Sequence, residues 1–353
     1  MKALESLALS PSRKPDVIRS TGIGSLPGTD IREAMTTVTG EFPDLVWLPE
    51  LPARGVGADM IGRTASLLAE VSEDFAVAPT PTGWRFADRP GAAMRRANAF
   101  LREDLDTLEE FCHMATSDVK VQIAGPVTLA ATIELMRGER AVRDAGALRD
   151  LVTAHRDAVL RHVIEVRRRL PKAQLIVQVD EPAMDAALRG LIPSQSGFTR
   201  LRALEEPLVR SWHAELAEAL RNAGTLPWMH SCSPNWHFAL AANAGYAALS
   251  GDFSLVRDAD DDDLGAAIER GVAIIAGVIP VQSVAPRTEA PTVSPIRARF
   301  QRLGFNDQVL AKSVVVSTTC GLGQATWPEA RIAMARTRAA AHVLADQLVD
   351  VSA

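Results

Sequence analysis

The sequence contains few cysteines and no long apolar segment. Only Cys112, Cys232 and Cys320 occur in 353 residues, too few for a disulfide framework. Residues 1–17 are charged and interrupted by two prolines, unlike a signal peptide, and no apolar run is long enough to span a bilayer. These absences lead us to expect a cytoplasmic protein with no membrane partner.

The sequence also has no excess of basic residues and almost no tyrosine. The formal net charge is -5, no basic stripe is present and there is a single Tyr, so we expect no nucleic-acid partner. The hydrophobic content of 47% and the charged content of 23% are those of a soluble protein with a large core. One or two domains are possible for this length, and a single barrel of this size is ordinary.

Eight apolar segments, mostly separated by helical patterns, dominate the chain. They are too uniformly apolar for half-exposed antiparallel strands and are typical of buried parallel strands. We therefore predict an α/β fold, a single-domain (β/α)8 TIM barrel over residues 17–353, after an N-terminal lead-in of residues 1–16. Pro and Gly interrupt residues 72–92, which predicts an inserted loop or hairpin after the second strand. The eight segments are residues 17–25, 42–48, 119–123, 175–179, 225–229, 246–250, 272–278 and 314–317.

Reactive polar residues gather at one end of the predicted strands. The carboxyl ends of barrel strands form the face on which barrel enzymes build their active sites. A random scatter would place about half of such residues at the other end, so this one-sidedness indicates a catalytic or metal site. The residues are Glu50, Asp180, Glu181, His230, Cys232, Asp252 and Cys320.

His230 and Cys232 are the best candidates for metal ligands. Residues two apart on a strand point to the same face, about 6–7 Å apart along it. Cys320 ends another strand, so an imidazole and two thiolates could bind one ion and leave a fourth position open, which favours Zn²⁺. Asp252 is the candidate carboxylate ligand, although it could equally be a turn aspartate. The alternative for the whole set is that the cysteines are ordinary buried residues.

A zinc ion with two thiolate ligands is a poor activator of water but keeps a bound thiol deprotonated and nucleophilic. This chemistry suits alkyl transfer to sulfur better than hydrolysis. Asp180 or Glu50 could hold a substrate ammonium group, while an ion pair or a cap is the alternative role of Asp180. The glycine-rich turn at residues 22–25 offers backbone N–H groups to a substrate carboxylate.

The chain resembles the C-terminal catalytic barrel of cobalamin-independent methionine synthase, in a short single-barrel form. The resemblance covers about residues 17–345, and the motifs that carry it occur in the order of that family. They are Ile23-Gly24-Ser25-Leu26-Pro27, Glu50, Gly125-Pro126-Val127-Thr128, Asp180-Glu181-Pro182-Ala183, His230-x-Cys232 and Cys320-Gly321-Leu322.

The resemblance implies a zinc-dependent methyltransferase that converts homocysteine to methionine. It implies zinc on His230, Cys232 and Cys320, which with Asp180 form the catalytic set. The family's further ligand is a Glu, for which Asp252 is the nearest equivalent here. Homocysteine would be bound by Ile23, Gly24, Ser25, Glu50 and Asp180.

The methyl donor and the thiol stay open at this point. The full-length synthases have a second, N-terminal barrel that helps to bind folate, and this sequence has one barrel. The donor could therefore be methyltetrahydrofolate, methylcobalamin or a corrinoid protein. Two alternatives remain: a zinc-dependent alkyltransferase acting on another thiol, as in the related coenzyme M transferases, and a non-catalytic relative that binds a ligand.

Overall fold

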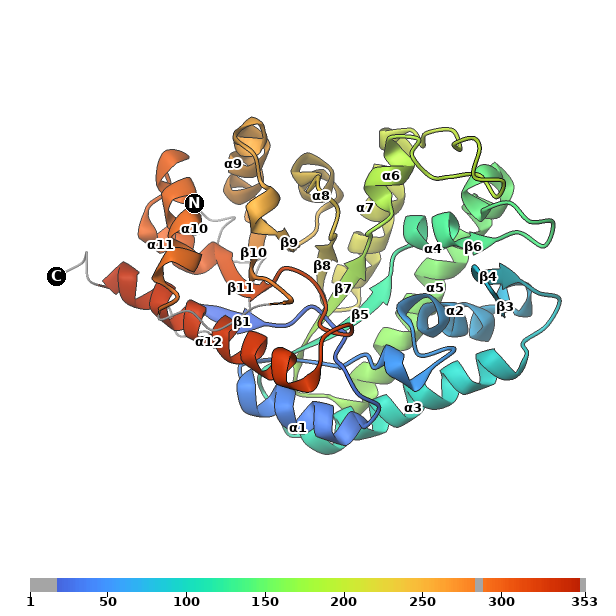
Figure 1. Cartoon of the computed structure of the whole chain (residues 1–353), viewed down its shortest axis with the longest axis horizontal. Coiled ribbons are helices and arrows are strands. Elements are labelled where there is room, and N and C mark those ends of the chain that lie inside the picture. The colour runs from blue at the N-terminus through green and yellow to red at the C-terminus, as the bar shows by residue number, and fades with distance from the viewer. Residues whose placement is uncertain (1–17, 283–287, 350–353) are drawn as a thin grey trace.

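Eight parallel strands form the wall of a barrel in the computed structural model, which describes residues 18–282 and 288–349 (Figure 1). The hydrogen-bonded order is β1-β11-β10-β9-β8-β7-β5-β2. The strands are β1 (Arg19–Thr21), β2 (Leu45–Trp47), β5 (Asp118–Ala124), β7 (Gln174–Asp180), β8 (Leu226–His230), β9 (Ala248–Asp252), β10 (Ala273–Ile279) and β11 (Val314–Thr318).

The two end strands, β1 and β2, meet just beyond their carboxyl ends. Ser25 and Glu50 form a parallel bridge there. The Leu26 N–H donates to the Glu50 carbonyl at 2.8 Å, and the Glu50 N–H donates to the Gly24 carbonyl at 3.2 Å. The barrel is thus nearly closed, and the predicted (β/α)8 fold is confirmed. The predicted lead-in, residues 1–16, lies outside the described residues.

Helices surround the strands (Figure 1). Several begin at the caps that the sequence provides: Asp30, Asp59 and Asp144 accept hydrogen bonds from first-turn N–H groups, and Pro126 opens α4. Among the described residues, no helix has the length and hydropathy needed to cross a membrane. The helices are α1 (Ile31–Glu41), α2 (Met60–Val71), α3 (Ala92–Cys112), α4 (Pro126–Thr132), α5 (Ala145–Arg169), α6 (Met184–Leu188), α7 (Glu206–Asn222), α8 (Phe238–Ala244), α9 (Asp261–Glu269), α10 (Ala290–Arg302), α11 (Asp307–Ser313) and α12 (Trp327–Val349).

The predicted insertion is a β-hairpin. Strands β3 (Val77–Thr80) and β4 (Gly83–Phe86) pair antiparallel, and β4 pairs in parallel with β6 (Ile133–Glu134). This small sheet is separate from the barrel wall and lies at the right edge of Figure 1. An ion pair of 2.6 Å between Arg85 and Glu134 joins the hairpin to β6.

The barrel interior has an apolar layer and, nearer the carboxyl ends of the strands, polar side chains. The apolar layer is a contact cluster that contains Ile176, Trp228, Ile275 and Val315 and is separate from the main core. On β7, Gln178 and Asp180 follow Ile176 with the same parity, so they point into the barrel above it. A buried ion pair of 2.5 Å between Arg19 and Asp118 lies at the other end, where β1 and β5 begin, so the carboxyl end is where the predicted site residues gather, not the only polar part of the interior.

Candidate metal centre

Three potential metal ligands from distant parts of the chain meet at the carboxyl end of the barrel. His230 is the last residue of β8, Cys232 follows two residues later, and Cys320 lies two residues beyond β11. The His230 Nε2 atom lies 3.0 Å from the Cys232 Sγ atom, and the two Sγ atoms are 2.7 Å apart. One ligand atom from each residue lies within 4.8 Å of the other two, a spacing that one metal ion can bridge.

The His230 ring is oriented by a partner on the neighbouring strand. Its Nδ1 atom lies 2.9 Å from the Ser250 hydroxyl oxygen on β9, and both residues are buried. This contact leaves Nε2 directed at the cysteines. Metal-binding histidines usually have such a partner on the second ring nitrogen, which fixes the ring for coordination.

A hydrogen bond joins the Cys232 and Cys320 thiols. It lowers the pKa of Cys320 against the opposing effect of burial, and His230 lowers it further. The same bond raises the pKa of Cys232, and burial adds to that rise. Both cysteines are free, Cys232 is exposed and Cys320 is partly exposed, so an ion can reach them. A soft cation bound to both sulfurs would favour their thiolate forms.

Asp252 lies outside the group of three. It is the last residue of β9, and its Oδ1 atom accepts hydrogen bonds from the Ser254 N–H at 2.9 Å and the Ser254 hydroxyl at 2.6 Å. These bonds cap the 3-10 turn Phe253–Leu255 and are those of a turn aspartate. Its role as the fourth ligand stays a prediction.

The turn at Ile23, Gly24 and Ser25 packs against the loop that carries Cys320. The Leu322 N–H donates to the Ser25 carbonyl at 2.8 Å, and the Gly323 N–H donates to the Ser25 hydroxyl at 3.2 Å. Gly24 lies against Gln122, because a Cβ atom added at Gly24 would be only 3.0 Å from the Gln122 Cγ atom. The predicted substrate turn and the predicted metal loop are therefore one packed unit.

Gly321→Ala is expected to weaken metal binding about tenfold or more, because it shifts the loop that supports Cys320. A Cβ atom at Gly321 would overlap the Ser25 Oγ atom, so the loop or Ser25 must move. Competition with a chelator measures the affinity. The matched control is Gly265→Ala on α9, where the nearest atom would be 4.0 Å from the new Cβ. Equal metal affinity of the two variants would contradict this packing role.

Glu50 and Asp180 are two buried carboxylates at the same end of the barrel. Burial raises the pKa of Glu50, against the opposing charges of Arg63 and Lys120. Burial and the charge of Glu50 raise the pKa of Asp180. Arg63 lies 3.7 Å from Glu50 and is also paired with Asp104, so these two carboxylates share one guanidinium charge. Because the charge of Glu50 disfavours ionisation of Asp180, a ligand cation beside Glu50 and Asp180 would stabilise this site.

Glu181, the neighbour of Asp180, points away from the barrel mouth and has a structural role. Its carboxylate accepts hydrogen bonds from the Val127 N–H at 3.0 Å and from the Thr128 N–H at 2.7 Å. These are first-turn groups of α4, where a negative charge is favourable. A Cβ atom at Gly125 would overlap the Glu181 carboxylate, so this position needs glycine. The motifs at residues 125–128 and 180–183 therefore contact each other through Glu181.

The sequence interpretation missed Lys120 and Gln178 as members of this site. Lys120 has no exposed surface, and its Nζ atom donates to the Ile23 carbonyl at 2.5 Å and to the Gln178 Oε1 atom at 2.8 Å. Burial lowers the pKa of Lys120 to about 7, while Asp180 and Glu50 oppose that shift. The available signal was a lysine inside a strand predicted to be buried, between Val119 and Val121.

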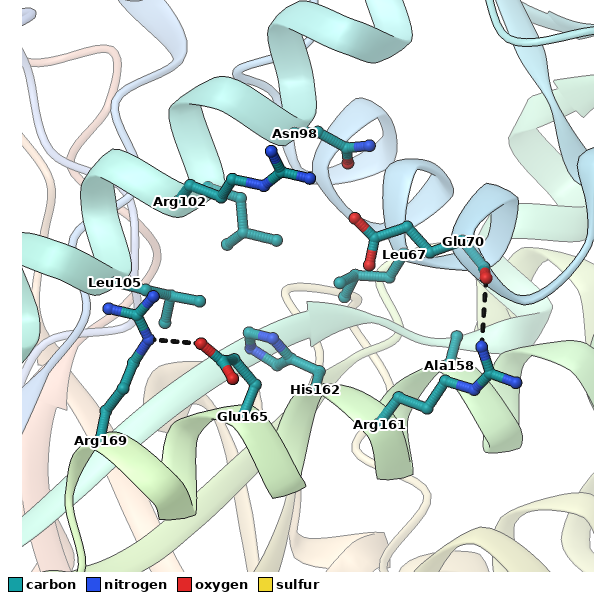
Figure 2. A pocket seen from close by; sticks show the side chains of 11 residues that line it. Leu67, Glu70, Asn98, Arg102, Leu105, Ala158, Arg161, His162, Glu165 and Arg169 are labelled. Carbon is teal, nitrogen blue, oxygen red and sulfur yellow. Dashed lines mark hydrogen bonds and ion pairs between the residues drawn. The ribbon is translucent and has the colours of Figure 1, made fainter.

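A cavity of about 330 Å³ lies outside the barrel, among α2, α3 and α5 (Figure 2). Its lining includes His162, Glu165 and Arg169, with Glu165 and Arg169 joined by a 2.7 Å ion pair. None of its lining residues is a predicted site residue. The helix-lined cavity is therefore separate from the candidate metal centre.

Comparisons with known proteins agree with the architecture. Residues 18–343 match the family model described as the catalytic domain of cobalamin-independent synthase. The structure of a B12-independent methionine synthase from Shewanella sp. W3-18-1, in complex with selenomethionine, aligns with a TM-score of 0.61 and 13% identity. The alignment covers 95% of this chain and 99% of that one.

Other comparisons are weaker. A mannanase from Podospora anserina aligns with a TM-score of 0.40 and 13% identity over 89% of this chain and 60% of that one. No curated protein matches the sequence. The family match spans nearly the whole barrel, and the chain belongs to the family of cobalamin-independent synthase catalytic domains.

Proposed function

We propose that this protein is a zinc-dependent methyltransferase that transfers a methyl group to the thiol of homocysteine and forms methionine. The observation that carries the proposal is the group of His230, Cys232 and Cys320, with ligand atoms within 4.8 Å of one another. Two buried carboxylates, Glu50 and Asp180, stand at the same end of the barrel. A metal site beside a cation site suits a substrate with a thiol and an ammonium group.

The donor set fits zinc. Two sulfurs and one imidazole nitrogen are ligands that Zn²⁺ prefers, and three protein ligands leave a position for a substrate atom. The Ser250 contact to His230 supplies the expected support for the ring. When bound, zinc would favour deprotonation of the substrate thiol and leave its sulfur nucleophilic.

The protein's own residues would bind and orient the amino-acid end of the substrate. Glu50 and Asp180 would accept hydrogen bonds from the ammonium group. Backbone N–H groups of the turn at residues 23–25 would bind the carboxylate. The substrate would then be held at both ends, so that its sulfur is aligned with the methyl donor. Such alignment lowers the entropic cost of an in-line displacement.

The charges around the site favour an amino-acid thiol over a sulfonate thiol. A sulfonate needs a cation that is not already paired. Lys120 donates to the Ile23 carbonyl and to Gln178, and Arg63 is bonded to Asp104. Glu50 and Asp180 are instead well suited to an ammonium group. Homocysteine should therefore bind more tightly than coenzyme M, and calorimetric titration with both thiols compares them.

The zinc-loaded enzyme is expected to form methionine from homocysteine with at least one of three donors: methyltetrahydrofolate, methylcobalamin or a methylated corrinoid protein. Methionine is measured by mass spectrometry with a labelled methyl group. Metal-stripped enzyme should be inactive and should recover when zinc is returned. If the zinc-loaded enzyme forms no methionine with any of these donors, the proposal is wrong. Homocysteine binding without turnover would instead favour a ligand-binding relative.

A further inference from the structure

Lys120 is a buried lysine without an assigned role in the proposed reaction. It lies in the middle of β5, has no exposed surface and points into the barrel. Transfer of a lysine side chain from water to a protein interior is costly, and an apolar residue of the same size is often as stabilising or more so. A lysine at this position therefore calls for an explanation beyond packing.

The contacts of Lys120 form a closed ring of hydrogen bonds. Its Nζ atom donates to the Ile23 carbonyl at 2.5 Å and to the Gln178 Oε1 atom at 2.8 Å. The Gln178 Nε2 atom donates to the same carbonyl at 3.0 Å and to the Asp180 Oδ1 atom at 2.7 Å. The ring thus joins the two predicted substrate contacts, the turn that begins at Ile23 and the carboxylate of Asp180.

Lys120 also balances charge in the barrel. Asp180 and Glu50 are both more than nine-tenths buried, and their attraction for the lysine opposes its loss of a proton. Without the lysine charge, Glu50 would keep Arg63 at 3.7 Å, whereas Asp180 would face the negative charge of Glu50 uncompensated, which disfavours its ionised form. The buried lysine therefore supports the charge state in which Asp180 and Glu50 can accept an ammonium group.

Lys120 is distant from the predicted metal ligands along the sheet. It pairs with Ile176, four residues before Asp180, and Asp180 pairs with His230. Four residues of a strand span about 13 Å. The Lys120 side chain covers part of this distance, but its hydrogen bonds go to Ile23 and Gln178 and not to a predicted metal ligand. A change at Lys120 should therefore act first on the amino-acid end of the site.

We propose that Lys120 is a positioning residue that fixes the Ile23 carbonyl and Asp180 for recognition of the amino-acid part of the substrate. This inference rests on the proposed function, because it assumes that the thiol substrate carries an ammonium group.

The test compares two thiols on zinc-loaded wild type and Lys120→Met. Homocysteine uses both ends of the site, whereas 2-mercaptoethanol offers only a thiol to the metal. Lys120→Met should weaken homocysteine binding about tenfold or more, and should change 2-mercaptoethanol binding by less than about twofold. Calorimetric titration gives both dissociation constants, and the exposed Lys172→Met is the matched control. Unchanged homocysteine binding, or equal weakening of both thiols, overturns the proposal.

If Lys120→Met folds poorly, a double-mutant cycle on the melting temperature still tests the proposal. Lys120→Met, Asp180→Asn and the double variant are compared with wild type by thermal unfolding. If the lysine compensates Asp180, the double variant should melt about 5 °C or more above Lys120→Met. Additive effects would overturn the proposed pairing. If wild type does not bind homocysteine at all, the proposed function fails, and this cycle still decides whether Lys120 and Asp180 act as a unit.

Discussion

Cys320→Ser is expected to lose its zinc and to reduce methyl transfer by at least about a thousandfold, while it stays folded. A serine hydroxyl is a weak ligand for Zn²⁺ compared with a thiolate, and only His230 and Cys232 would remain of the three grouped ligands. Cys320 lies in a loop beyond β11 and is partly exposed, so its replacement should cost little stability. Metal content of purified protein and the rate of methionine formation are the two measurements.

Cys112→Ala is the matched control for this prediction. Cys112 is the third cysteine, lies on α3 in the core, and burial raises the pKa of its thiol to about 11. Its removal should lower stability and leave zinc content unchanged. Cys232→Ser should behave like Cys320→Ser. Stoichiometric zinc of unchanged affinity in both serine variants would contradict the assignment of the cysteines as ligands.

Glu50→Gln is expected to weaken homocysteine binding about 10- to 100-fold and to leave zinc content unchanged. The amide has nearly the shape of the carboxylate, but it lacks the charge that an ammonium group needs. Hydrogen bonds to charged groups contribute about 1.5–3 kcal/mol, which corresponds to this range. Binding of 2-mercaptoethanol, which lacks an ammonium group, is the internal control and should not change. If homocysteine binds equally to wild type and Glu50→Gln, Glu50 does not recognise the substrate.

The same carboxylates predict a pH dependence. The pKa values of Glu50 and Asp180 are both raised by burial, and the ammonium group requires the ionised forms. Homocysteine affinity of wild type should therefore fall as the pH is lowered, starting at a higher pH than for an ordinary carboxyl group.

The barrel could be predicted because most of its strands are recognisable in the sequence as apolar segments. The strands β7 and β10 are long and buried on both faces, and they contain mostly apolar residues. The positions of His230 and Cys320 followed from the strands that precede them. The order of the strands around the barrel could also be predicted, because successive parallel strands joined by helices are usually neighbours in the sheet.

Other features depend on contacts that a single sequence does not display. The first strand spans only Arg19–Thr21, because residues 22–25 turn to meet Glu50 and the loop beyond Cys320. The form of the insertion depends on pairing between β4 and β6, which are far apart in the chain. Lys120 was overlooked because a lysine between two valines is typical of a strand with one face exposed to solvent. Only its partners, Ile23 and Gln178, reveal that it is buried.

The most direct test of the proposed metal centre is X-ray absorption spectroscopy of the zinc-loaded protein, with and without homocysteine. We expect two sulfur ligands at about 2.3 Å and one nitrogen ligand in the free protein, because Cys232, Cys320 and His230 would bind the ion. Addition of homocysteine should raise the sulfur count to three. A zinc ion without sulfur ligands, or a sulfur count that homocysteine does not change, would contradict the central claim that this site holds a metal for a substrate thiol.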